Sequence, residues 1–256
     1  MNNDKHPVSH PLTVEVCVDS AQSALAAQQG GAHRVELCDN LVEGGTTPSA
    51  GAIELICARL AIPVCVMIRP RGGDFLYSDL EFAIMRRDVE VAQRLGAAGV
   101  VFGLLNPDGT VDEARVAELV ALARPLSVTF HRAFDMTREP FAALDRLIAL
   151  GVDRVLTSGQ ERSAVEGLDL LTALVERAGD RIVIMAGGGV NARNLERVVA
   201  RSGVREVHIA PRVDVESGME FRNPNTFMGA AFRPPEYAIR VIDADAVRAC
   251  VGLAQR

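Results

Sequence analysis

The chain has 256 residues, a formal net charge of -6 and a hydrophobic content of 48%, with 4% aromatic residues and no tryptophan. The negative charge argues against a nucleic-acid partner, which would require a basic surface. The apolar runs are shorter than the roughly 20 residues that a membrane helix needs, so we expect no membrane association. The five scattered cysteines do not form a disulfide framework, which indicates a reducing, cytoplasmic environment.

The sequence alternates between short strand patterns and helix patterns. Residues 1–12 are polar and are expected to form a disordered or extended tail. The first predicted strand, Thr13–Asp19, leads into an Ala-rich helix that Ser20 caps. A long irregular segment at about 211–242 precedes the last helix. The other predicted strands are His33–Asp39, Pro63–Arg69, Gly99–Leu104, the start of Val128–Asp135, Asp153–Thr157, Arg181–Ala186 and Val204–Ala210.

About eight strand–helix units with short connections predict an α/β protein whose parallel sheet closes into a TIM (β/α)8 barrel. We expect a single domain over residues 13–256. A doubly wound open sheet is the alternative, because Gly187–Ala192 fits the loose dinucleotide pattern GxGxxA. That stretch follows the seventh strand, where too little sheet remains for a dinucleotide-binding half. We therefore favour the barrel.

The strand alternation predicts an unusually polar barrel interior, since alternate residues face inward and the others face the helices. Valines 14, 16 and 18 form the helix-facing set of the first strand, so Glu15, Cys17 and Asp19 point inward. Arg69 and Arg71 could simply neutralise the inward glutamates, but polar groups at the carboxyl ends of barrel strands are more often a site. The same alternation turns these residues inward: Glu36, Cys38, Cys65, Met67, Arg69, Arg71, Thr129, His131, Glu206 and His208.

Two groups of polar residues at strand ends suggest acid–base chemistry or anion binding. Glu36 and His131, near Arg69, could act as catalytic acid–base residues or bind a carboxylate or phosphate. The run Gly187, Gly188 and Gly189, predicted to open a helix at Asn191, could present backbone N–H groups to an anion. Ser158, after the sixth strand, offers a similar small polar donor.

The third group is a pair of thiols. Cys17 and Cys38 each follow a glutamate by two residues, on predicted neighbouring strands that lie about 4.8 Å apart. Two thiolates within reach of one ion would suit Cu(I). Alternatively, both cysteines are small hydrophobic residues of the core, and no CxxC motif argues otherwise. The residues alone leave both interpretations open.

Six motifs follow one another along the chain: Glu15–Ser20, Arg34–Cys38, Glu43–Ser49, Ile68–Ser78, Val128–Asp135 and Arg154–Gly159. Together they resemble the CutC family, and the resemblance covers nearly all of residues 12–210. It implies a TIM barrel, a cytoplasmic role in copper homeostasis, and Cu(I) binding through Cys17 and Cys38.

The eighth strand departs from that family's pattern. Small residues, often a serine, usually follow its histidine, whereas this chain has Ile209, Ala210, Pro211 and Arg212 after His208. An anion site built from hydroxyls of the eighth loop is therefore weakened, unless Arg212 replaces them.

The sequence supports two hypotheses. The first is a copper homeostasis protein that binds copper as Cu(I), with no organic cofactor. The second is a TIM-barrel enzyme of unknown reaction that acts on a small phosphate- or carboxylate-bearing molecule. The segment at 211–242 could cap the barrel mouth or join subunits of a homo-oligomer. The binding residues expected at the mouth are Glu15, Arg69, Arg71, Asp74, Asp135 and His208.

Overall fold

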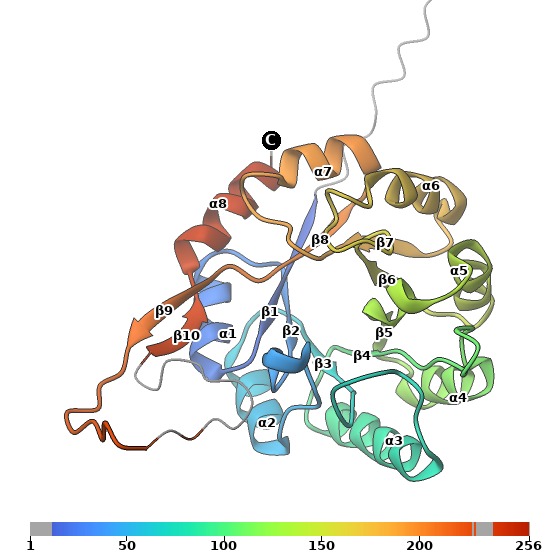
Figure 1. Ribbon diagram of the computed structural model, residues 1–256. Helices are drawn as coiled ribbons and strands as arrows, with labels where there is room; N and C mark the ends of the chain where they lie inside the picture. The colour runs from blue at the N-terminus through green and yellow to red at the C-terminus, as the bar shows by residue number, and fades with distance from the viewer. Residues whose placement is uncertain (1–11, 227, 229–237, 256) are drawn as a thin grey trace, which may run out of the picture.

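The computed structural model describes residues 12–226, 228 and 238–255. Eight parallel strands follow one another in chain order and close into a barrel, because β1 pairs with both β2 and β8. Figure 1 looks along the barrel, which the helices surround, so the predicted TIM barrel is confirmed. The strands are β1 (Thr13–Val18), β2 (Arg34–Leu37), β3 (Val64–Met67), β4 (Gly99–Phe102), β5 (Ser127–Phe130), β6 (Arg154–Thr157), β7 (Val183–Ala186) and β8 (Glu206–Ile209).

Side-chain caps fix the start of several helices. As predicted, Ser20 caps α1, since its hydroxyl accepts a hydrogen bond from the Ser23 amide. Ser78 and Glu81 form a reciprocal capping box at α3. The helices are α1 (Ala21–Gln29), α2 (Ala50–Arg59), α3 (Asp79–Arg94), α4 (Glu113–Ala123), α5 (Pro140–Ala149), α6 (Leu168–Ala178), α7 (Leu195–Ser202) and α8 (Ala244–Ala254), with short 3-10 helices η1 (Leu41–Glu43) and η2 (Arg132–Met136).

The buried apolar side chains form two separate clusters, which confirms the predicted strand alternation. The larger cluster lies between the barrel and the helices and contains Val14, Val16 and Val18. The smaller one occupies the barrel interior, and it is made of cysteine and other side chains of opposite parity. Its members are Cys17, Cys38, Cys65, Met67 and Val101.

The segment expected to be irregular contains regular structure at both ends. Strands β9 (Arg212–Glu216) and β10 (Ala238–Ile242) pair antiparallel, and the Ile242 amide donates to the Ser23 hydroxyl of α1. Figure 1 shows this ribbon beside α1 and α8, at the side of the barrel and not over its centre. The proposed cap over the mouth is therefore not formed by the described part of the segment, and a role between subunits stays a prediction.

Two further expectations concern the chain outside the barrel. The tail predicted for residues 1–12 lies outside the described residues, except for buried Leu12. Among the helices that the structure describes, none has both the length and the hydrophobicity required to span a bilayer.

Candidate functional site

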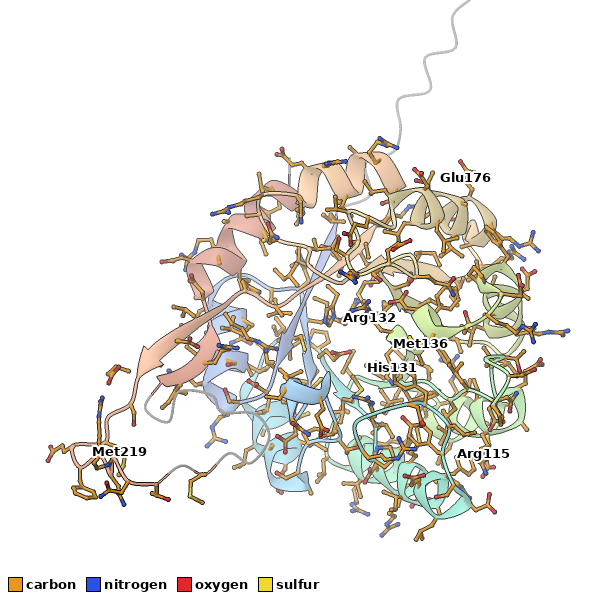
Figure 2. All side chains as sticks on the ribbon, in the orientation of Figure 1. Arg115, His131, Arg132, Met136, Glu176 and Met219 are labelled. Carbon is orange, nitrogen blue, oxygen red and sulfur yellow. The ribbon has the colours of Figure 1, made fainter. Side chains whose placement is uncertain are left out.

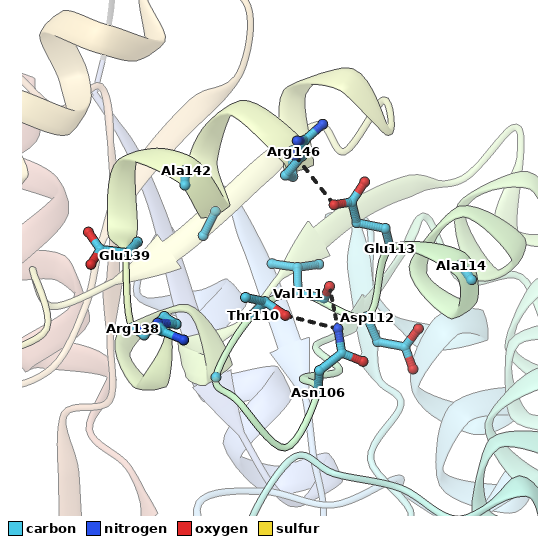
Figure 3. Close-up of a pocket in the computed structure, with 12 residues that line it drawn as sticks. Asn106, Thr110, Val111, Asp112, Glu113, Ala114, Arg138, Glu139, Ala142 and Arg146 are labelled. Atoms are coloured by element: carbon cyan, nitrogen blue, oxygen red, sulfur yellow. Dashed lines mark hydrogen bonds and ion pairs between the residues drawn. The ribbon is translucent and has the colours of Figure 1, made fainter.

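A cavity of about 240 Å³ opens at the carboxyl ends of the strands. Figure 2 shows His131 and Arg132, which both line it, near the centre of the barrel. A larger hollow of about 680 Å³ lies between the loop before α4 and the start of α5, and none of the predicted site residues lines it (Figure 3). The mouth cavity is lined by Cys17, Glu36, Glu43, Gly44, Met67, Arg69, Phe75, His131, Arg132, Leu156 and His208.

The two predicted thiols are in contact inside the barrel. The register pairs Cys17 with Glu36, so Cys38 lies two residues beyond the position opposite Cys17. The sulfur atoms are nevertheless only 3.9 Å apart, and both cysteines are buried. Cys38 also donates to the Glu36 carboxylate at 3.4 Å. Cys17, Cys38 and Glu36 thus place three potential ligand atoms within 4.8 Å of one another.

Their environment makes the two thiols unequal. The hydrogen bond from Cys38 lowers the pKa of Cys17 against the effect of burial, and His208 lowers it further. The pKa of Cys38 is raised by that same interaction with Cys17 and by burial. Cys17 is therefore the thiol that loses its proton first.

His208 connects the thiols to two buried glutamates. Its Nδ1 lies 2.8 Å from Glu15, and its Nε2 lies 3.8 Å from Glu36. Burial alone would lower the pKa of His208, but Glu36, Cys17 and Glu15 raise it well above its usual value. Burial raises the pKa of Glu36 to about 8, which keeps that carboxyl largely protonated at neutral pH. Glu36 and His208 can therefore take up or release a proton when the charge beside them changes.

Below this cluster, the buried glutamates pair with other arginines than the sequence predicted. Arg69 and Arg71 were the expected partners of the buried glutamates, and that expectation is wrong. Arg34 forms ion pairs with Glu15 and Glu206, and Arg154 lies 2.5 Å from Glu206. Arg34 and Arg154 have the inward parity of their strands, so the alternation alone could have identified both.

Burial and charge act in opposite directions on Glu15. Burial would raise the pKa of its carboxyl, but the Arg34 guanidinium and then His208 lower the pKa to about 2. Glu15 is therefore ionised and permanently paired, and it has a structural role in orienting His208.

Arg69 lies in the cavity wall but is bound to backbone. Its guanidinium donates to the carbonyl oxygens of Glu43, Gly45 and Gly73 at 2.7–2.8 Å. It also lies over the Phe75 ring, 5.1 Å from the ring centre. These contacts fix a positive charge at the mouth and attach the β2–α2 loop to the β3–α3 loop.

Arg71 and Asp74 lie apart from the cavity, which corrects the inward placement of Arg71. Arg71 is partly exposed and bonds to Glu81 at 2.6 Å and Asp74 at 3.0 Å. The alternation fails here because β3 ends at Met67 and the chain then bends. A binding role for Arg71 and Asp74 stays a prediction that the geometry of the mouth does not favour.

Asp135 organises the loop after β6 instead of lining the cavity. It accepts hydrogen bonds from the Thr157 hydroxyl at 2.5 Å and from the amides of Ser158 and Gln160 at 3.1 Å. Arg132 bridges Asp135 and the Ser158 hydroxyl, at 2.7 and 2.9 Å. Arg132 was not predicted as a site residue, although it belongs to the His131–Asp135 cluster in the sequence.

The glycine loop differs from the predicted anion site. Helix α7 begins at Leu195 and not at Asn191, so Gly187, Gly188 and Gly189 are not at its N-terminus. The Gly187 amide donates to Thr157, and the Gly188 carbonyl accepts from Ala164. The first of these bonds uses the Gly187 N–H, one of the donors that an anion would need. Anion binding by Ser158 and the glycines stays a prediction.

Gly103 provides the space that His131 occupies. A Cβ atom at Gly103 would lie 2.6 Å from the imidazole Nδ1 and Cε1 and 2.7 Å from the Ala133 Cβ. We expect Gly103→Ala to lower the free energy of unfolding by about 1–3 kcal/mol through overpacking, and to shift the His131 ring resonances in NMR spectra. In Gly51→Ala, at an open position of α2, we expect no loss of stability in the same denaturant titrations. Equal stability of the two variants would contradict this account of the His131 position.

The fold and this site define a TIM-barrel protein whose mouth holds a buried cluster of thiol, carboxylate and imidazole groups. The chain matches the CutC family over residues 12–213. It is 51% identical over 251 residues to the copper homeostasis protein cutC homolog of Homo sapiens, covering 98% of this chain and 92% of that protein. The homolog of Mus musculus is 49% identical over 255 residues, covering 100% and 94%. The chain therefore belongs to the CutC family.

Solved structures agree with this assignment. The structure of a CutC protein from Streptococcus agalactiae has a TM-score of 0.74 and 38% sequence identity, and the match covers 77% of this chain and 97% of that one. A phosphoribosylanthranilate isomerase from Thermotoga maritima has a TM-score of 0.55 at 16% identity, covering 95% and 98%. The second likeness shows the barrel fold alone.

Proposed function

We propose that this protein takes part in copper homeostasis and binds Cu(I) through Cys17 and Cys38. The contact between the two buried sulfur atoms, at 3.9 Å, is the observation on which this proposal depends. Soft thiolate ligands select Cu(I) over the hard cations that carboxylates prefer. The relatives named as copper homeostasis proteins support the same reading.

The donor set fits one ion bound by both cysteines. The sulfur separation is below about 4.6 Å, twice the roughly 2.3 Å metal–sulfur distance of zinc sites, so one ion can contact both sulfurs. Binding requires both thiols to release their protons. His208 and Glu36 lie beside the pair and can accept or lose protons when the charge of the site changes.

The state of the cysteines agrees with this role. All five are free, and Cys17 and Cys38 could not bind a metal as a disulfide. We propose a cytoplasmic location, where thiols stay reduced.

Competition for Cu(I) between the reduced protein and a chromogenic chelator tests the proposal. We expect one bound Cu(I) per chain, and a loss of affinity of roughly a hundredfold or more in Cys17→Ser and in Cys38→Ser, since each variant removes one of two thiolate ligands.

Cys57→Ser is the matched control, because Cys57 is a half-buried cysteine on α2, outside the barrel interior. Its Cu(I) affinity should equal that of the unsubstituted protein. Affinity that survives in both Cys17→Ser and Cys38→Ser would refute the thiol site.

A further inference from the structure

Among the residues that the structure describes, three that line the mouth cavity, Glu36, Arg69 (at Nε) and His131, each have a buried polar atom without a hydrogen-bond partner. Within the part of the chain that the structure describes, Glu36 Oε1 and His131 Nε2 are buried and have no hydrogen-bond partner. Glu36 is on β2 and His131 directly follows β5, so they approach the cavity from different strands. Leaving such a group unpaired costs about 1–3 kcal/mol, and buried polar groups are seldom left so. Both atoms therefore indicate a molecule that binds between them.

The hydrogen bonds that His131 and Glu36 already make define the kind of partner that each unpaired atom needs. His131 Nδ1 accepts a hydrogen bond from the Ala133 amide at 3.1 Å, so the proton of the neutral ring is on Nε2, which must donate. The other oxygen of Glu36 receives the Cys38 thiol. Oε1 then matches a hydroxyl group, which can donate or accept. The complementary molecule has an acceptor oxygen near His131 and a hydroxyl near Glu36.

The charge of the cavity indicates that the acceptor belongs to an anion. Arg69 is bound to carbonyl oxygens, and among the described residues no carboxylate lies within ion-pair distance of it. Its charge is close enough to His131 to contribute, after burial, to a lowered pKa of that ring. Arg132 adds a second guanidinium to the lining, and the Asp135 carboxylate already pairs with it at 2.7 Å, so Arg69 is the main source of positive charge. Glu43 also lines the cavity, but its carboxylate accepts from the Asn40 amide group at 2.5 Å.

The size of the cavity limits the ligand. A volume of about 240 Å³ corresponds to about eight water molecules at roughly 30 Å³ each, so the ligand has a similar number of non-hydrogen atoms. Phe75, Met67 and Leu156 contribute apolar wall that suits a short carbon chain. A whole nucleotide or peptide would extend beyond this volume.

We propose that the barrel mouth binds a small hydroxylated organic anion, a carboxylate or a phosphate. Its anionic group accepts the His131 Nε2–H and faces Arg69 and Arg132, and its hydroxyl meets Glu36. This proposal does not depend on copper binding, because none of these groups needs a metal to act. The acid–base roles expected for Glu36 and His131 from the sequence remain predictions, and such a ligand would be their substrate.

Calorimetric titration of the metal-free, full-length protein tests the proposal with four probes: glycerate, glycerol 3-phosphate, propionate and propyl phosphate. We expect saturable binding of one hydroxylated probe per chain, at least tenfold tighter than its counterpart without the hydroxyl. Comparison of glycerate with glycerol 3-phosphate distinguishes a carboxylate ligand from a phosphate ligand. Absence of saturable binding for all four probes, or equal affinity with and without the hydroxyl, overturns the proposal.

The variant His131→Asn removes the Nε2–H donor but keeps the hydrogen bond that holds the side chain in place. The asparagine carbonyl can still accept the Ala133 amide, but the variant has no N–H at the Nε2 position. We expect the affinity for the preferred probe to fall at least tenfold, and to be unchanged in Arg146→Gln, on the exposed face of α5. Should His131→Asn not fold, Arg132→Gln is expected to weaken binding similarly. Unchanged affinity in the folded variant contradicts the site, and since no copper is present the result is independent of the thiol proposal.

Discussion

Arg34→Met is expected to lower the free energy of unfolding by about 3–5 kcal/mol, the largest effect of any single substitution considered for this barrel. Arg34 is the shared partner of Glu15 and Glu206, and Glu15 is completely buried. Removing the guanidinium leaves a buried carboxylate with only His208 to compensate it. Urea unfolding followed by circular dichroism at pH 7 measures the loss.

Two companion variants identify the cause of this loss. Arg34→Met combined with Glu15→Gln removes both charges, so it should recover part of the stability that Arg34→Met loses. Arg146→Met removes an exposed arginine of α5 and should change little, because surface pairs contribute little. If Arg34→Met were as stable as the parent protein, the interior ion pairs would have no structural role.

The second large effect is a loss of stability in acid that depends on His131. Burial, and then the Arg69 charge, lower the pKa of His131 to about 3 from an ordinary value of 6.5. Between these values the unfolded chain binds a proton that the folded protein does not, so the contribution is complete above pH 6.5 and is lost as the pH falls. The slope from this one group approaches about 1.4 kcal/mol per pH unit.

His131→Asn isolates this contribution, because other groups titrate in the same range. We expect the unfolding free energy of the parent protein to fall more steeply than that of His131→Asn between about pH 6 and pH 4. Measurements at pH 7 and 8 provide the reference, since His131 is neutral in both states there. Parallel curves would show that His131 is protonated in the folded protein and that its ring is not buried as a neutral donor.

The sequence predicted the inward-facing residues wherever the chain remains extended. Glu15, Cys17, Glu36 and His131 all lie inside the barrel, because successive side chains of a strand point to opposite faces. The prediction failed at Arg71, where β3 has ended and the alternation no longer applies. It also failed at α7, since the asparagines at 191 and 194 form a turn before the helix.

Strand alternation assigned a side chain to the interior, but it did not identify its partner. Arg34 and Arg154 could have been placed inside from their parity, yet their pairing with Glu15 and Glu206 depends on the stagger of the closed barrel. The same stagger brings Cys38 against Cys17 although the register pairs Cys17 with Glu36. Contacts of this kind join positions from 19 to 193 residues apart in the chain.

By itself, the sequence determined the barrel, the polar interior at its carboxyl end and the family, because repeated strand–helix units and local alternation are properties of neighbouring residues. Only the tertiary structure decided which cation neutralises which buried carboxylate, that the two thiols touch, and that His131 and Glu36 each keep an unpaired polar atom at the cavity. These features depend on distances across the barrel, which closure and strand stagger fix and which local sequence patterns do not contain.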